Sequence, residues 1–312
     1  MDWRDLSGET SQNGAPSISP KLSSMRTRPI CPARRRPWYV WLIGGCFGVL
    51  ILLGAFCGAL GGLAVGVYQF VFHEPTVSAD TLRTFTVQGA PQVFVTNPAG
   101  SVTFAPGEDG AVRIEATRRA RDHTEDDARK ALGTISLDLG HDGETVSVVA
   151  RFSGHGSAWP GASRTVDLLI TVPVKTSATV SQSAGDATVG ALTGPLSLHV
   201  DAGNVRVAGA TINGPSDVQV GAGNVSMDGA LAQATVLAIR IDAGNATLTL
   251  PAATSAHIEA TAHAGTVIVH GWPISTRHTS GATLLAAGDT RSSPQARLTV
   301  EVDAGDITIQ SR

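Results

Sequence analysis

A short pattern that recurs about every 20 residues limits what the second half of this chain can fold into. The pattern is a variable residue, then Ala-Gly, then usually Asn or Asp, then an alternating apolar strand. Its glycines are Gly185, Gly203, Gly223, Gly244, Gly265 and Gly305. Self-similarity at this spacing indicates repeated units that bury their apolar faces by stacking on one another.

Residue types predict the shape of each unit. Glycine and asparagine tolerate positive φ, so an Ala-Gly-Asn sequence can form a sharp corner. The asparagines at these corners are Asn204, Asn224 and Asn245, and equivalent asparagines are expected to stack in a ladder. In the strand that follows, Val205 and Val207 should point inward and Arg206 outward, because side chains alternate along a strand. The long gap before Gly305 is expected to hold one degenerate unit around residues 287–289.

These units predict an all-β fold, a single right-handed parallel β-helix or solenoid over residues 80–312, with its clean repeats at 183–312. The 35 glycines and an aromatic content of only 5% agree with many tight turns around a core of small aliphatic residues. The charged segment 118–132 interrupts the strands. We expect it to form a short helix, N-capped by Thr124, that covers one end of the solenoid.

The segment 38–72 carries no charged residue and predicts one transmembrane helix. Arg34, Arg35 and Arg36 precede it, so the positive-inside rule places the tail 1–37 in the cytoplasm and the C-terminal domain outside. The tail is rich in Ser, Pro and Arg and is predicted to be disordered. A cleaved signal peptide, ending near Val77-Ser78-Ala79, is the alternative.

Four glycines within this segment recur at every fourth position: Gly54, Gly58, Gly62 and Gly66. They line one helix face and could let two helices pack closely, which predicts self-association. Glycine is also common in transmembrane helices, so composition alone is the competing explanation.

Several function classes are disfavoured by composition. Beyond the hydrophobic segment acidic residues outnumber basic ones, so nucleic acid is not an expected partner. All three cysteines, Cys31, Cys46 and Cys57, precede residue 58, which leaves the C-terminal domain without disulfides or cysteine-bound metal.

Further residues connect the chain to a known family. An Ala-Gly-Ser-Val-Thr-Phe strand is followed by a charged helix, an Asp-Gly hairpin, the stretch Val166–Pro173 and the glycine corners. This order, over residues 80–312, resembles the bacterial putative-adhesin family, a family of unknown function. The resemblance implies a β-helix ectodomain in the cell envelope and carries no catalytic residues.

The residue pattern disfavours enzyme chemistry. Stacked corners could align Asp186, Asp201, Asp242, Asp303 and Asp306, and two such carboxyls could serve a polysaccharide-degrading enzyme or a calcium site. Sugar-binding aromatic residues are scarce, however, and the nine-residue calcium-roll pattern is absent. The histidines, including His257 and His263, show no zinc motif. No cofactor is therefore expected.

We therefore expect a single-pass membrane protein that presents a non-catalytic, adhesin-like domain to an unidentified envelope or surface partner. An envelope-stress sensor or other regulatory membrane protein is the main alternative. A β-helix enzyme acting on polysaccharide is a distant one.

Overall fold

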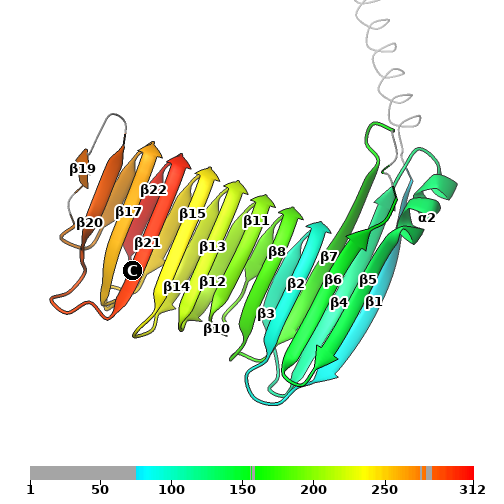
Figure 1. The fold of residues 1–312 in the computed structure, drawn as a ribbon, viewed down its shortest axis with the longest axis horizontal. Helices are drawn as coiled ribbons and strands as arrows, with labels where there is room; N and C mark the ends of the chain where they lie inside the picture. The colour runs from blue at the N-terminus through cyan, green and yellow to red at the C-terminus, as the bar shows by residue number, and fades with distance from the viewer. Residues whose placement is uncertain (1–74, 155, 157–158, 275, 279–282) are drawn as a thin grey trace, which may run out of the picture. The chain divides into compact units, whose positions relative to one another are not determined.

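The computed structural model describes residues 75–312, except 155, 157–158, 275 and 279–282. These residues belong to one compact unit, Phe72–Arg312, which contains two sheets of 11 strands each and one described helix, α2 (Glu125–Gly133) (Figure 1). The predicted transmembrane helix at 38–72, the tail 1–37 and the four glycines of the stripe lie outside the described residues. Among the residues described, no helix is long and apolar enough to cross a membrane.

Sheet A has the strand order β1-β4-β7-β3-β9-β12-β14-β16-β22-β18, with β10 paired to β12. Its strands are β1 (Thr76–Thr86), β3 (Val102–Pro106), β4 (Ala111–Arg121), β7 (Ser163–Val172), β9 (Ala187–Val189), β10 (Thr193–Gly194), β12 (Val205–Ile212), β14 (Val225–Leu231), β16 (Ala246–Leu250), β18 (Val267–His270) and β22 (Ile307–Ser311).

Sheet B has the strand order β19-β20-β17-β21-β15-β13-β11-β8-β2-β6-β5. Its strands are β2 (Gln92–Ala99), β5 (Ile135–Asp142), β6 (Thr145–Phe152), β8 (Ser177–Ala184), β11 (Leu196–Ala202), β13 (Pro215–Ala222), β15 (Val236–Ala243), β17 (Ala256–Ala264), β19 (Thr276–His278), β20 (Leu284–Asp289) and β21 (Ala296–Ala304).

The core consists of the inward-facing residues of both sheets. Alternation along each strand buries Val205 and Val207 and leaves Arg206 exposed, as predicted. The fully buried side chains are mostly Val, Ile, Leu and Ala, and Phe104 is the largest of them. Because these side chains are small, the two sheets can pack closely along their whole length.

Each Ala-Gly corner connects a strand of sheet B to a strand of sheet A, as β11 continues into β12 and β13 into β14. Equivalent strands of neighbouring units pair in parallel without a shift at the corner, so Val205 lies beside Val225 and Val225 beside Ala246. One such pair of strands with its corner is called a coil below.

The predicted fold class, a single right-handed parallel β-helix, is wrong. Both sheets are mixed: β4 pairs antiparallel with β1 and β7, β5 with β6, and β20 with β17 and β19. The long strands β1 and β4 and the hairpin β5–β6 do not follow the 20-residue repeat. The ladder is parallel from β7 to the edge strand β18 in sheet A, and from β17 to β6 in sheet B.

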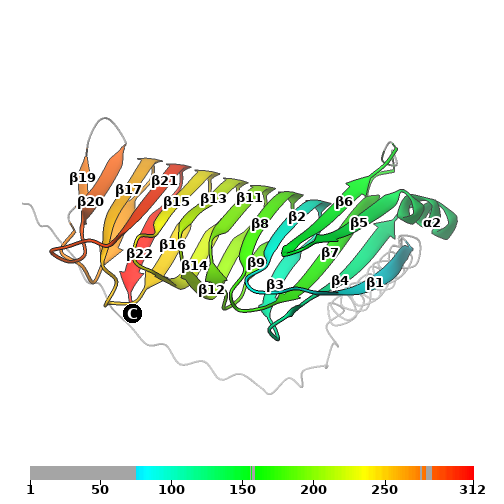
Figure 2. The same cartoon turned by 60° about the horizontal axis from the view of Figure 1, so that its bottom comes forward.

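The coils also do not stack in sequence order. The last coil, β21–β22, lies between β15–β16 and β17–β18, although it follows both in the chain (Figures 1 and 2). Residues 287–289, predicted to form a degenerate coil, instead belong to β20, which pairs antiparallel with the far edge of β17. Since β19 and β20 occupy that edge, the chain returns to pair with the other edge of β17.

The predicted short helix is present and begins directly after its predicted N-cap, Thr124. Residues 118–121 belong to β4, because their backbone pairs with both β1 and β7. Thr124 caps the helix by accepting a hydrogen bond from the Asp127 backbone N–H at 3.2 Å. The helix packs against β1, β4 and β5, two of which are edge strands.

Candidate functional site

The six repeat glycines all form corners with positive φ, between +116° and +156°. Their close approach explains why glycine is needed: a Cβ on Gly223 would lie 1.8 Å from the carbonyl oxygen of Gly203. Gly100 forms an equivalent corner with φ of +122°, one coil before the clean repeats begin.

The asparagine ladder expected from the spacing is present. Asn224 donates its backbone N–H and its Nδ2 group to Oδ1 of Asn204, at 3.1 and 3.2 Å. Asn245 binds Oδ1 of Asn224 in the same way, at 3.0 and 3.2 Å. Asp186 lies at one end of the ladder and Asp306 and Thr266 lie at the other. Each side-chain oxygen therefore satisfies a backbone N–H of the next corner.

Hydrogen bonds at the end of this ladder lower the pKa of Asp306 below its ordinary value of 3.8. The larger cause is the Thr266 hydroxyl, which donates to Oδ1 at 2.7 Å, and the second is the Thr266 backbone N–H at 2.8 Å. Because the pKa is lower in the folded state, this contact stabilises the fold above pH 3.8 and is lost as the pH falls through the folded pKa.

The five aspartates that could have formed one carboxylate row separate into two rows. Asp186 and Asp306 lie in the hydrogen-bonded ladder at the corner turn. Asp201, Asp242 and Asp303 instead precede the alanine of each corner, on the outer face of sheet B. The five aspartates therefore do not form a single row.

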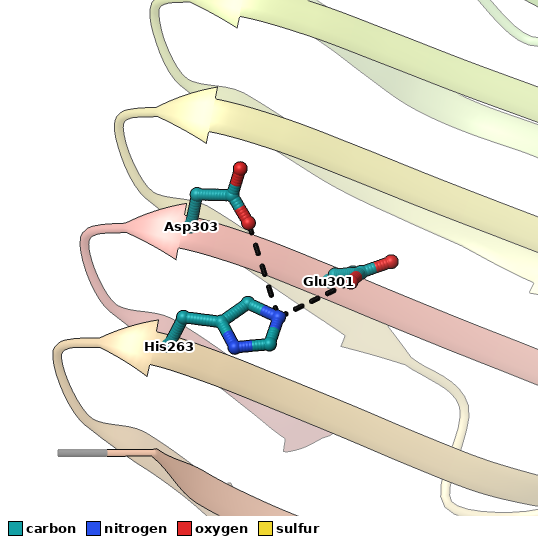
Figure 3. A group of neighbouring side chains, drawn as sticks. All are labelled: His263, Glu301 and Asp303. Atoms are coloured by element: carbon teal, nitrogen blue, oxygen red, sulfur yellow. Dashed lines mark hydrogen bonds and ion pairs between the residues drawn. The ribbon is translucent and has the colours of Figure 1, made fainter. Parts of the chain in front are cut away.

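Among the described residues, the outer row contains a group of one imidazole and two carboxylates, His263, Glu301 and Asp303, called the triad below (Figure 3). Nε2 of His263 lies 3.2 Å from Oε1 of Glu301 and 3.9 Å from Oδ1 of Asp303. Arg240 approaches the other oxygen of Glu301 at 3.5 Å. All three side chains of the triad are about half exposed, at 46%, 41% and 62%.

The triad was missed in the sequence because it depends on the order of the coils. His263 and Asp303 occupy the same position of the repeat, directly before Ala-Gly, and β17 pairs with β21 so that these positions are opposite one another. If the coils stacked in sequence order, the coil predicted around residues 287–289 would lie between the two strands. Alignment of the repeats reveals the shared position but not that the two strands are neighbours.

A separate cleft of about 570 Å³ lies beside α2. There the ring centroids of His123 and Trp159 are 4.1 Å apart. The Arg164 guanidinium lies 5.1 Å from the centroid of the Phe152 ring. Arg164 also donates to the Thr134 hydroxyl, at 2.9 Å. These contacts join the helix and the loop before β7 to the sheets.

Comparisons with known proteins provide structural neighbours only. No protein-family model matches the chain, and no curated protein matches it. Among solved structures, it is similar to a putative cell adhesion protein from Clostridium sporogenes, with 13% identity, a TM-score of 0.40, and coverage of 76% of this chain and 100% of that one. It is also similar to a putative adhesin from Bacteroides fragilis, with 14% identity, a TM-score of 0.38, and coverage of 75% and 97%.

Proposed function

We propose that this chain is a non-catalytic, adhesin-like interaction protein whose described domain is held outside the cytoplasmic membrane by the segment 38–72. The observation that carries this proposal is the outer face of sheet B over β11, β13, β15, β21 and β17, called the charged face below. Its ionisable side chains, all exposed or half-buried, are His199, Asp201, Asp217, Arg240, Asp242, His257, Glu259, His263, Arg297, Glu301 and Asp303.

The charged face is a fixed array and not a set of mobile loops. Neighbouring strands lie about 4.8 Å apart, and the backbone ladders hold every second side chain on this face. Carboxylates outnumber guanidinium groups on this face. Pairs such as Arg297 with Glu259, at 3.7 Å, leave Asp217 and Asp242 without an ion pair to any described residue. Such an array suits an extended partner that offers repeated cationic or hydrogen-bonding groups.

The membrane location can be tested with the chain's own cysteines. We expect Asp217→Cys on the charged face to react with a membrane-impermeant maleimide in intact spheroplasts. Native Cys31, which lies in the predicted cytoplasmic tail, should react only after permeabilisation. Labelling of Cys31 but not of position 217 in intact spheroplasts would contradict the proposed topology.

The interaction role requires a separate measurement. Cells producing the full chain should adhere to a layer of envelope material more strongly than cells producing an Asp217→Lys, Glu259→Lys double variant at the same level. Both positions are outward-facing, so the substitutions reverse charge without entering the core. Equal adhesion by both strains and by cells that lack the protein would refute the proposed role.

A further inference from the structure

We propose that His263, Glu301 and Asp303 form a binding site for Zn²⁺ or a similar divalent transition-metal ion. The three residues supply one imidazole nitrogen and two carboxylate oxygens, and their donor atoms all lie within 4.8 Å of one another (Figure 3). Nitrogen and carboxylate oxygen together are typical zinc ligands, whereas calcium and magnesium bind oxygen almost exclusively.

The distances agree with coordination of one ion. Zinc bonds to imidazole nitrogen and carboxylate oxygen are about 2.0–2.2 Å long, so two donors on one tetrahedral zinc are roughly 3.4 Å apart. The observed separations from Nε2 of His263 are 3.2 Å to Glu301 and 3.9 Å to Asp303. The third separation, between the Glu301 and Asp303 oxygens, is within 4.8 Å, and rotation of these two exposed side chains would bring all three donors to this spacing.

The backbone holds the three donors in position. Glu301 and Asp303 are two positions apart on β21, with Val302 between them, so their side chains share the outer face. His263 lies opposite Asp303 on β17, because Ala264 pairs with Ala304 in the parallel register. Ligands on paired strands are placed more precisely than ligands on loops, which favours a defined geometry.

The local charge favours a dication. Asp242 on β15 lies next to Asp303 in the outer row, since Ala243 pairs with Ala304, and adds a third carboxylate. Arg240 is the cation close to this group, and it approaches the Glu301 oxygen that does not face His263. Three carboxylates against one guanidinium leave an excess of two negative charges, which a divalent ion would neutralise.

Space remains for solvent or a further ligand. A hollow of about 370 Å³ lies on the side of the donors away from His263 and is lined by Arg240, Ile241, Asp242, Glu301 and Asp303. Three protein ligands with an open position are the arrangement in which zinc exchanges water for an external donor group. A metal here could therefore exchange its bound water for a donor group of a partner that lies on the charged face.

The test is a Zn²⁺ titration of the full chain, purified in detergent without a histidine tag and with its cysteines alkylated, so that thiolates do not bind the metal. We expect the wild-type protein to bind one equivalent more tightly than His263→Ala does. Loss of a ligand should weaken that site by at least the roughly 10–100-fold effect known for residues that merely orient ligands. Glu301→Gln, which keeps the side-chain size, should weaken it as well.

His199 provides the matched control. It also lies on the outer face, and its Nε2 contacts a single carboxylate, Asp201, at 3.1 Å. His199→Ala should therefore leave the tight equivalent unchanged. Equal Zn²⁺ stoichiometry and affinity in wild type and His263→Ala would show that the triad is an imidazolium–carboxylate pair only, and would overturn the proposal. Circular dichroism of each variant checks that the fold is retained.

Discussion

Gly223→Ala is expected to destabilise the protein by roughly 2–6 kcal/mol, one of the two largest effects we predict. The added Cβ would lie 1.8 Å from the Gly203 carbonyl oxygen, and the φ of +150° is one that L-residues rarely adopt. Backbone strain of this kind costs about 1–3 kcal/mol, and forcing extra volume into a close contact costs about 1–3 kcal/mol more. Urea unfolding of the full chain, followed by circular dichroism, measures the effect.

Two other glycines separate the cost of the positive φ from the cost of the close Cβ contact. Gly143 also has positive φ, +61°, but a Cβ there would meet nothing within 4 Å, so Gly143→Ala should cost only about 1 kcal/mol from its conformation. Gly133 at the end of α2 has neither constraint, and Gly133→Ala should be close to neutral. A Gly223→Ala variant no less stable than Gly143→Ala would contradict the close approach of the corners.

Truncation after Gln295, which removes β21 and β22, is expected to abolish cooperative unfolding of the domain. These strands pair on both sides, with β15 and β17 in one sheet and with β16 and β18 in the other. They contribute five fully buried aliphatic side chains, Leu298, Val300, Val302, Ile307 and Ile309. At about 1.5–3 kcal/mol each, these approach the whole net stability of a typical domain, ~5–15 kcal/mol.

The control for this truncation ends after Gln310 and removes only Ser311 and Arg312. It should keep a cooperative transition with a slightly lower midpoint, since Arg312 contributes an exposed ion pair to Asp228, at 2.5 Å, and two backbone hydrogen bonds. If removal of β21 and β22 lowered the unfolding midpoint only as much as the control truncation does, these strands would form the last coil of the stack, as their place in the sequence suggests. That result would contradict their position between β15–β16 and β17–β18.

Local features of the fold could be predicted from the sequence because they depend on neighbouring residues. The inward Val205 and Val207, the positive φ of Gly223 and the N-cap at Thr124 all follow from residue type and spacing within a few positions. The asparagine ladder could be predicted as well, because Asn204, Asn224 and Asn245 occur in consecutive coils that are also neighbours in the structure.

The strand order could not be predicted, because the coils are nearly interchangeable. A β15 strand can pair with β17 or with β21 in the same register, since both end in Ala-Gly and both alternate in the same phase. In the structure β20 occupies one edge of β17, so β21 can pair with β17 only at the edge that faces β15. The triad of His263, Glu301 and Asp303 depends on this choice and was missed with it.

A pair of cysteine cross-links tests this strand order most directly. In a full chain with its native cysteines replaced by alanine, Arg240→Cys with Glu301→Cys should form a disulfide under mild oxidation, because the two residues are opposite one another on β15 and β21. Arg240→Cys with Thr261→Cys should not, because β21 separates those strands and about 9.6 Å exceeds the ~7 Å reach of a disulfide. Peptide mass spectrometry without reduction identifies each product. Cross-linking of the second pair but not the first would place β15 beside β17 and contradict the account.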